Sequence, residues 1–271
     1  MKISSQFLSR NRVVAIACAV LAMTALAPMA HAHDIVLVPE TSGLRVRLGH
    51  PGDWQSVDVE KLLELQTMTG DGAAQDRHGA LKRNGLDMVL AKPAAKTTAP
   101  QMTAARYDNG LWVELPAVGK AKPEWRNTSR FMLPGATGVL ASIKFAKGYA
   151  GNAADTVVYA RKTGHLLELI PQKNPLSLRD GEKLPVLLLL NGKPLADVGI
   201  EMSNLKDKMP EDKIPRFATD ANGIAQVPVR PRGVNTLAVD VKRPNDGSFG
   251  ANAKALPAEN VMMVATYTFV R

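Results

Sequence analysis

Short apolar runs that alternate with polar residues, and that are separated by Gly, Pro, Asn and Asp, dominate the chain after residue 32. Residues 44–48 alternate with period two, so their leucines and valine share one face. An amphipathic helix would instead repeat its apolar residues every three or four positions, and that period is nearly absent. The pattern therefore predicts an all-β fold.

The first two expected strands, at residues 35–38 and 44–48, are close enough in sequence to pair as antiparallel neighbours around the segment 39–43. A helical turn is expected at 58–63, with Asp58 as its N-cap. Further strands are expected at 65–69, 85–90, 102–107, 111–115, 138–147, 166–170, 183–190, 196–202, 224–229, 234–241 and 261–270.

One turn signal stands out in the first half of the chain. Asp108-Asn109-Gly110 separates the runs 102–107 and 111–115, and Asn-Gly tolerates the positive φ that tight turns require. This segment therefore predicts a β-hairpin.

Turn signals become regular after Gly164-His165, with Asn191-Gly192-Lys193-Pro194 and Asp220-Ala221-Asn222-Gly223 between apolar runs. Such spacing is typical of a small β-sandwich of about 100 residues. We therefore expect two β-sandwich-like domains, an N-terminal one at 33–165 and a C-terminal one at 166–271.

The N-terminus has the pattern of a cleaved secretory signal peptide at 1–32. Basic residues precede an apolar run at 13–27, Pro28 ends the run, and Ala30-His31-Ala32 supplies the small residues of a cleavage site. The run is shorter than the ~20 residues that span a bilayer, so the processed chain is not expected to be transmembrane. The style of signal indicates export to a periplasm, with His33 as the new N-terminus.

Charge and cysteine content exclude several function classes. The formal net charge is +9, and removal of the three basic residues of the signal leaves +6, scattered along the chain. With no basic helix or known motif, nucleic-acid binding is not expected. The single cysteine, Cys18, lies in the predicted signal, so the processed chain has no thiol or disulfide. Lipidation at Cys18 is the alternative, although Ala15-Ile16-Ala17 matches a lipobox poorly.

A terminal histidine suggests a metal site, because its amine and its imidazole Nδ1 can close a chelate ring. If strands 35–38 and 44–48 pair, His33 and His50 lie at the same end, which would supply three nitrogens for Cu(II) or Ni(II). Asp34 or Glu40 could add an oxygen, and His165 at the expected domain junction is a further candidate ligand. The alternative is that His33-Asp34 is only a remnant of processing and that His50 caps a loop.

Motifs of enzymes are missing from the sequence. It contains no Gly-x-Ser-x-Gly, no His-Glu-x-x-His and no glycine-rich phosphate loop, so we do not expect an enzyme.

Two resemblances emerge from these segments. Residues 191–198 and 219–223 resemble the prealbumin-like or carboxypeptidase-regulatory-like β-sandwich over about 166–271. Residues 30–35, 48–52, 107–112 and 164–171, in this order, resemble domain-of-unknown-function family 4198, a family of periplasmic proteins. Where that family often has a histidine or serine ahead of a lysine, this chain has Phe145-Ala146-Lys147.

The second resemblance implies secretion and a link to transition metals, since some members are described as nickel or cobalt uptake components. We therefore expect a periplasmic accessory protein that binds nickel, cobalt or copper and passes the ion to an envelope transporter or outer-membrane receptor. The ligand chemistry favours copper, whereas the resemblance favours nickel or cobalt. The alternative is a non-catalytic protein-interaction module of the envelope that holds no metal and docks a partner along a strand edge.

Overall fold

The computed structural model describes residues 33–70, 72–91, 99–116, 119, 124–206, 209–210, 213–246 and 258–271. The predicted signal peptide at 1–32, with Cys18, lies outside the described residues. Within them the chain forms eighteen β-strands and four short 3₁₀ turns and no α-helix, which confirms the all-β prediction. No helix in this part of the chain is long and apolar enough to cross a membrane.

The strands form three sheets. Sheet A has the order β1 (Ile35–Glu40), β2 (Gly43–His50), β7 (Asp87–Ala91) and β6 (Leu81–Asn84), and β3 (Asp53–Gln55) also pairs with β2. Sheet C contains β11 (Leu167–Pro171), β12 (Lys183–Leu190) and β13 (Lys193–Pro194), and β16 (Ile224–Pro228) also pairs with β12.

Sheet B is the largest, with nine strands among the described residues. Its order is β15 (Arg216–Ala218), β14 (Gly199–Asn204), β17 (Val234–Pro244), β18 (Asn260–Val270), β10 (Gly138–Ala150), β8 (Gln101–Leu115), β4 (Leu62–Met68) and β5 (Gln75–Asp76), and β9 (Glu124–Asn127) pairs with β8. The 3₁₀ turns are η1 (Val59–Lys61), η2 (His78–Ala80), η3 (Arg130–Met132) and η4 (Val158–Ala160). The expected turn at Asp58 is confirmed, because the Asp58 side chain accepts a hydrogen bond from the Glu60 amide at the start of η1.

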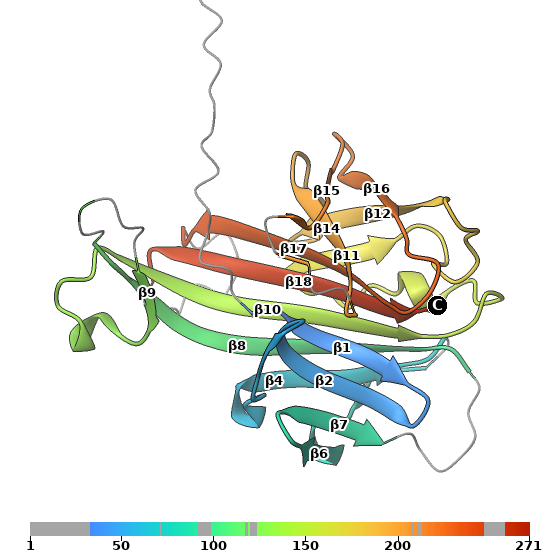
Figure 1. The fold of residues 1–271 in the computed structure, drawn as a ribbon, viewed down its shortest axis with the longest axis horizontal. Helices are drawn as coiled ribbons and strands as arrows, with labels where there is room; N and C mark the ends of the chain where they lie inside the picture. The colour runs from blue at the N-terminus through green and yellow to red at the C-terminus, as the bar shows by residue number, and fades with distance from the viewer. Residues whose placement is uncertain are drawn as a thin grey trace, which may run out of the picture. The chain divides into compact units, whose positions relative to one another are not determined.

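Sheet B packs against both other sheets. Ala104 of β8 and Phe145 of β10 belong to a core shared with sheet C, whereas the next residues, Ala105 and Ala146, belong to a core shared with sheet A. Figure 1 shows the blue strands of sheet A against β8 and β10, with the yellow strands of sheet C near β17 and β18. Burial on both faces explains why β10 is a nearly continuous apolar run instead of an alternating one.

The two predicted domains share this central sheet. β4, β8 and β10 come from residues 33–165, and β14, β15, β17 and β18 come from residues 166–271. A parallel ladder between β10 and β18, from Leu140 and Asn260 to Tyr149 and Phe269, joins the two sets. The expected boundary at 165 therefore lies within one continuous central sheet. Residues 166–271 supply all of sheet C and four neighbouring strands of sheet B, and these two layers share one apolar core.

The predicted hairpin at Asp108-Asn109-Gly110 is wrong, because β8 runs without a break from Gln101 to Leu115. Asn109 and Gly110 lie opposite the single residue Ser142, so β8 carries one extra residue in a bulge where its register with β10 shifts. Gly110 adopts φ 81° there, and the Asn109 carbonyl accepts hydrogen bonds from the Trp112 ring and the Asn127 amide. The positive φ expected at Gly110 is confirmed, but it occurs in a bulge of a continuous strand and not in a chain reversal.

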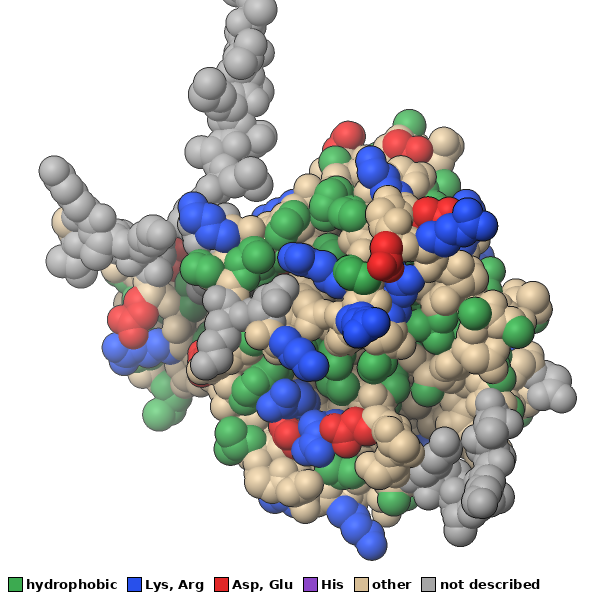
Figure 2. Space-filling view, turned by 45° about the vertical axis from the view of Figure 1, so that its right-hand side comes forward, with side chains coloured by type: hydrophobic (Ala, Val, Ile, Leu, Met, Phe, Trp, Pro, Cys, Tyr) green, Lys and Arg blue, Asp and Glu red, His purple; other side chains and the backbone are tan. Residues whose placement is uncertain are grey.

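The surface carries mixed charge. On the face shown in Figure 2, Lys and Arg side chains are interspersed with apolar and acidic ones. The arrangement matches the moderate and scattered positive charge of the sequence.

β1 is an edge strand whose open side rests on sheet B. Its other side pairs with β2 over six residue pairs. On the open side, the Thr266 hydroxyl of β18 donates a 2.7 Å hydrogen bond to the Ile35 carbonyl. Further along, a Cβ at Gly148 of β10 would lie only 2.6 Å from the Leu37 carbonyl oxygen, so the absence of a side chain at Gly148 allows the close approach.

We therefore predict that Gly148→Ala destabilises the protein by about 1–3 kcal/mol, the usual cost of overpacking. The effect should appear as a lower midpoint of chemical denaturation. Gly135→Ala is the matched control, because a Cβ at Gly135 meets no atom within 4 Å. Equal midpoints for the two variants would contradict the edge packing of β1.

Candidate functional site

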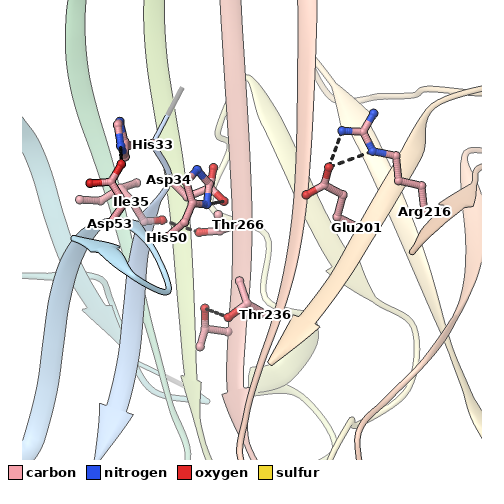
Figure 3. Close-up of polar contacts among 10 residues, drawn as sticks. His33, Asp34, Ile35, His50, Asp53, Glu201, Arg216, Thr236 and Thr266 are labelled. Carbon is pink, nitrogen blue, oxygen red and sulfur yellow. Dashed lines mark hydrogen bonds and ion pairs between the residues drawn. The ribbon is translucent and has the colours of Figure 1, made fainter. Parts of the chain in front are cut away.

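The pairing of β1 with β2 brings two histidines together. The last ladder pair joins Ile35 and Leu48, and the Gly49 amide then donates a 2.8 Å hydrogen bond to the Asp34 carbonyl. This extension of the ladder places His33 beside His50, with ring centroids 5.7 Å apart and planes tilted by 31° (Figure 3). The expected meeting of His33 and His50 is therefore confirmed.

A tight reversal after β2 adds two polar side chains. Gly49 adopts φ 123°, and a Cβ there would overlap the Asp53 carbonyl oxygen. β3 then runs back along β2, with Asp53 opposite His50 and Gln55 opposite Leu48. The reversal places Asp53 and Gln55 around the His33 ring.

Asp53 fixes the tautomer of His33. The His33 Nε2 lies 2.8 Å from Asp53 Oδ2 and 3.2 Å from the Gln55 amide. The hydrogen bond from His33 and its charge lower the pKa of the Asp53 carboxyl, so this group is ionised at neutral pH and can only accept. Donation from Nε2 to this carboxylate requires the proton of the neutral ring on Nε2 and leaves the lone pair on Nδ1; the Gln55 amide nitrogen is also a donor and forms no hydrogen bond with Nε2 in that tautomer.

A carboxylate and a lysine lie in the protein interior next to the two rings. Asp34 Oδ2 is 3.9 Å from His50 Nδ1, and the Asp34 side chain is only 15% exposed. Lys144 of β10 has no exposed surface, and its Nζ has no hydrogen-bond partner. Lys144 and Asp34 act on each other electrostatically.

Burial controls the protonation of these groups. It raises the pKa of Asp34 to about 6 against the opposing effect of Lys144, and lowers the pKa of Lys144 to about 8 against the effect of Asp34. Burial, together with His33 and Lys144, lowers the pKa of His50 to about 4. At neutral pH the site therefore holds a largely ionised Asp34, a largely charged Lys144 and a neutral His50.

The local charges favour a cation. Asp240 of β17 is close enough to Asp34 to contribute to its raised pKa. On β14, the Glu201 carboxylate is matched by Arg216, whose Nε lies 2.9 Å from it (Figure 3). Asp34 is therefore opposed by Lys144, while Asp240 adds negative charge near Asp34 and Asp53 adds it beside the histidine rings.

Two further candidates lie elsewhere. His165 packs its ring 5.1 Å from that of Phe145, in the core that sheet B shares with sheet C, and its Nε2 lies 4.0 Å from Glu64. Lys144 is on the opposite face of β10, so the structure does not bring His165 to the pair of histidines. Glu40, considered as an oxygen ligand, ends β1 at its far end and forms an ion pair with Arg45.

The side chains alone do not complete a metal site. Among the described residues, no three His, Cys, Asp or Glu side chains are arranged to hold an ion. The two imidazoles and Asp34 supply part of a donor set, and the free amine expected at His33 after cleavage would supply a further nitrogen.

Sequence reasoning missed three residues of this site. Asp53 and Gln55 reach His33 only because the chain reverses at Pro51-Gly52 and returns along β2 as β3, a strand that the sequence pattern did not predict. Lys144 had a detectable signal, because it lies within a strand of mainly apolar residues and a lysine is seldom buried there without a reason.

The fold and the site together define an all-β protein in which the first strand carries a polar end with paired histidines. The family model described as Domain of unknown function (DUF4198) matches residues 30–243, and the chain belongs to this family. No curated protein and no solved structure matches it. The matched region includes His33, His50 and Lys144.

The raised pKa of Asp34 and the lowered pKa of His50 make opposite contributions to stability. The folded pKa of His50, about 4, lies below its ordinary 6.5, so its contribution is complete above pH 6.5 and is lost as the pH falls toward 4. The folded pKa of Asp34, about 6, lies above its ordinary 3.8, so its contribution is gained as the pH falls from 6 to 4.

We therefore predict that Asp34→Asn exposes the effect of His50. Between pH 6.5 and 4, the unfolding free energy of this variant should fall more steeply than that of the wild type, by at most about 3 kcal/mol at 1.36 kcal/mol per pKa unit. Denaturant unfolding at several pH values measures the slope. Adding His50→Gln should remove the extra slope, and equal slopes for Asp34→Asn and the wild type would contradict the assignment.

Proposed function

We propose that the protein is exported to the periplasm and binds one transition-metal ion at the His33 end of β1 and β2. The observation that carries the proposal is the close pairing of the His33 and His50 rings, 5.7 Å apart. The ion is passed on to an envelope transporter or an outer-membrane receptor, and the protein itself catalyses no reaction.

The protonation of both rings suits this role. Asp53 holds the proton of His33 on Nε2, which leaves Nδ1 as the donor that can share a chelate ring with the α-amine. Hydrogen bonds from the non-ligating nitrogen commonly orient metal-binding histidines in this way. His50, with its pKa near 4, is neutral and does not need to lose a proton before it binds.

The amine sets the pH dependence of binding. Its ordinary pKa is about 7.7–8.0, and it must be deprotonated to act as a ligand. We therefore expect affinity to fall in mild acid through the amine, while His50 remains neutral until the pH approaches 4.

Nitrogen-rich sites of this kind accept Cu(II) and Ni(II), both of which tolerate tetragonal coordination. The resemblance to proteins of nickel and cobalt uptake favours Ni(II) or Co(II). The proposal therefore extends to these three ions.

The alternative function, a protein-interaction module without metal, has one observation of its own. Phe131 and Met132 of η3 are 96% and 73% exposed, which is unusual for two adjacent large apolar side chains. This surface lies on the segment between β9 and β10 and requires neither His33 nor a particular N-terminus.

Metal titration of exported protein tests the proposal, after intact mass shows that the chain begins at His33. We expect one Cu(II), Ni(II) or Co(II) ion to bind per chain. An extra alanine ahead of His33 should weaken binding at least about tenfold, because it removes the amine from the chelate ring, and His50→Gln should weaken it as well.

His78→Gln is the matched control, because the His78 ring contacts the Val59 carbonyl and belongs to η2, away from this site. It should bind as the wild type does. Absence of binding by protein that begins at His33 would refute the proposal, and binding that ignores both the added alanine and His50→Gln would place the ion elsewhere.

A further inference from the structure

A second polar site lies between sheets A and B at the other end of β1 and β2. It is a cavity of about 110 Å³, bounded by Glu40 and Gly43 at the turn of sheet A and by Thr67 and Thr103 of sheet B. Seven residues of extended chain separate His33 from Glu40, which corresponds to roughly 20 Å at the usual rise per residue. The cavity is therefore distinct from the histidine pair.

The cavity begins where polar side chains replace the apolar side chains of the core between the two sheets. Leu65, Ala105 and Ala146 fill one row of this core with apolar side chains. Two residues further along the same face, the corresponding positions are Thr67, Thr103 and Gly148. Hydroxyl groups and a missing side chain thus replace core packing at this end.

Arg77 contributes the positive charge of the cavity. Its backbone amide donates a 2.8 Å hydrogen bond to the Leu65 carbonyl, so Arg77 lies beside β4 in continuation of the β4–β5 ladder. The guanidinium Nε is buried and has no hydrogen-bond partner. This donor at the cavity wall therefore has one hydrogen bond that no protein group supplies and that solvent or a bound acceptor can complete.

The other charge in the wall is already neutralised. Glu40 receives two hydrogen bonds from Arg45, from Nε at 2.5 Å and from Nη2 at 3.2 Å. Arg77 is therefore the charged residue of the described wall that has no opposite charge, and the cavity has a net positive charge suited to a monoanion.

We propose that this cavity binds a small organic monocarboxylate of three or four carbons that carries a hydroxyl or keto oxygen. The planar guanidinium of Arg77 matches a carboxylate, whereas Leu44, Leu90 and Ala150 accept a short carbon chain. The Thr67 and Thr103 hydroxyls, 3.2 Å apart, can exchange hydrogen bonds with the additional oxygen.

The size of the cavity supports this class. An engineered apolar cavity of about 150 Å³ accepts benzene, which has six non-hydrogen atoms, so 110 Å³ encloses about four. A small hydroxy or keto acid therefore fills the cavity and extends its remaining atoms toward solvent. A phosphate dianion fits the charge less well, because one arginine balances one negative charge and the Glu40 carboxylate is also part of the wall.

Calorimetric titration of the metal-free processed protein with L-lactate tests the proposal, with chemical shifts of the Thr103 and Gly148 amides as a second readout. We expect one lactate per chain and shift changes at both amides. Arg77→Met should weaken binding at least about tenfold, and Thr103→Val, which keeps the shape but removes a hydroxyl, should weaken it severalfold.

Arg179→Met is the matched control, because it removes an exposed arginine near sheet C and should bind lactate as the wild type does. His50→Gln should also retain lactate binding, which separates this proposal from the metal site. Thermal melts establish that each variant is folded. No lactate binding, binding unchanged by both Arg77→Met and Thr103→Val, or preferential binding of inorganic phosphate would overturn the proposal.

Discussion

The contact between the open edge of β1 and the face of sheet B is the constraint on which the rest of the structure depends. An edge strand with unpaired backbone groups normally needs protection, and here Thr266 bonds the Ile35 carbonyl while Gly148 lets the Leu37 carbonyl approach closely. This contact fixes how sheet A lies on sheet B. Its position along β1 therefore determines where the apolar core lies and leaves the two ends of the β1–β2 pair to polar residues.

The two buried lysines of β10 differ in how their charge is balanced. On the sheet C side of β10, Lys147 forms a 2.5 Å ion pair with Glu168 and also donates to the Arg161 and Leu169 carbonyls. On the sheet A side, Lys144 lacks such a partner, and burial lowers its pKa. The Lys147–Glu168 pair satisfies its own charges and hydrogen bonds, so its burial needs no functional explanation. A buried lysine with no bonded partner, next to Asp34 and His50, is costly for folding, and this cost is more readily understood if the group has a role in binding.

Local sequence signals predicted most of the longer strands, the Asp58 turn and the proximity of His33 to His50, because each depends on neighbouring residues or on one short antiparallel ladder. They missed short strands such as β3, β6 and β9. They could not predict the parallel pairing of β10 with β18, since those strands are more than 100 residues apart and both are apolar on each face. The same limitation explains the error at Asn109-Gly110, where hydrogen bonds from Trp112 and Asn127 select a bulge. It also explains why His165 was considered near His33, since the sequence does not show which face of sheet B each residue occupies.

The β1–β2 pair has opposite chemistry at its two ends. At His33, the carboxylates of Asp34 and Asp53 beside the histidine rings favour a cation. At Glu40, the unmatched Arg77 favours an anion. Because β1 is held on sheet B between these ends through Ile35 and Leu37, neither end can shift without disturbing the same backbone contacts. A ligand that tightened one end would therefore act on a strand that is already fixed, so the two ends are expected to bind independently. Coupling between the two binding sites would require β1 to adopt a second position on sheet B. The close contact between Gly148 and the Leu37 carbonyl opposes such a shift.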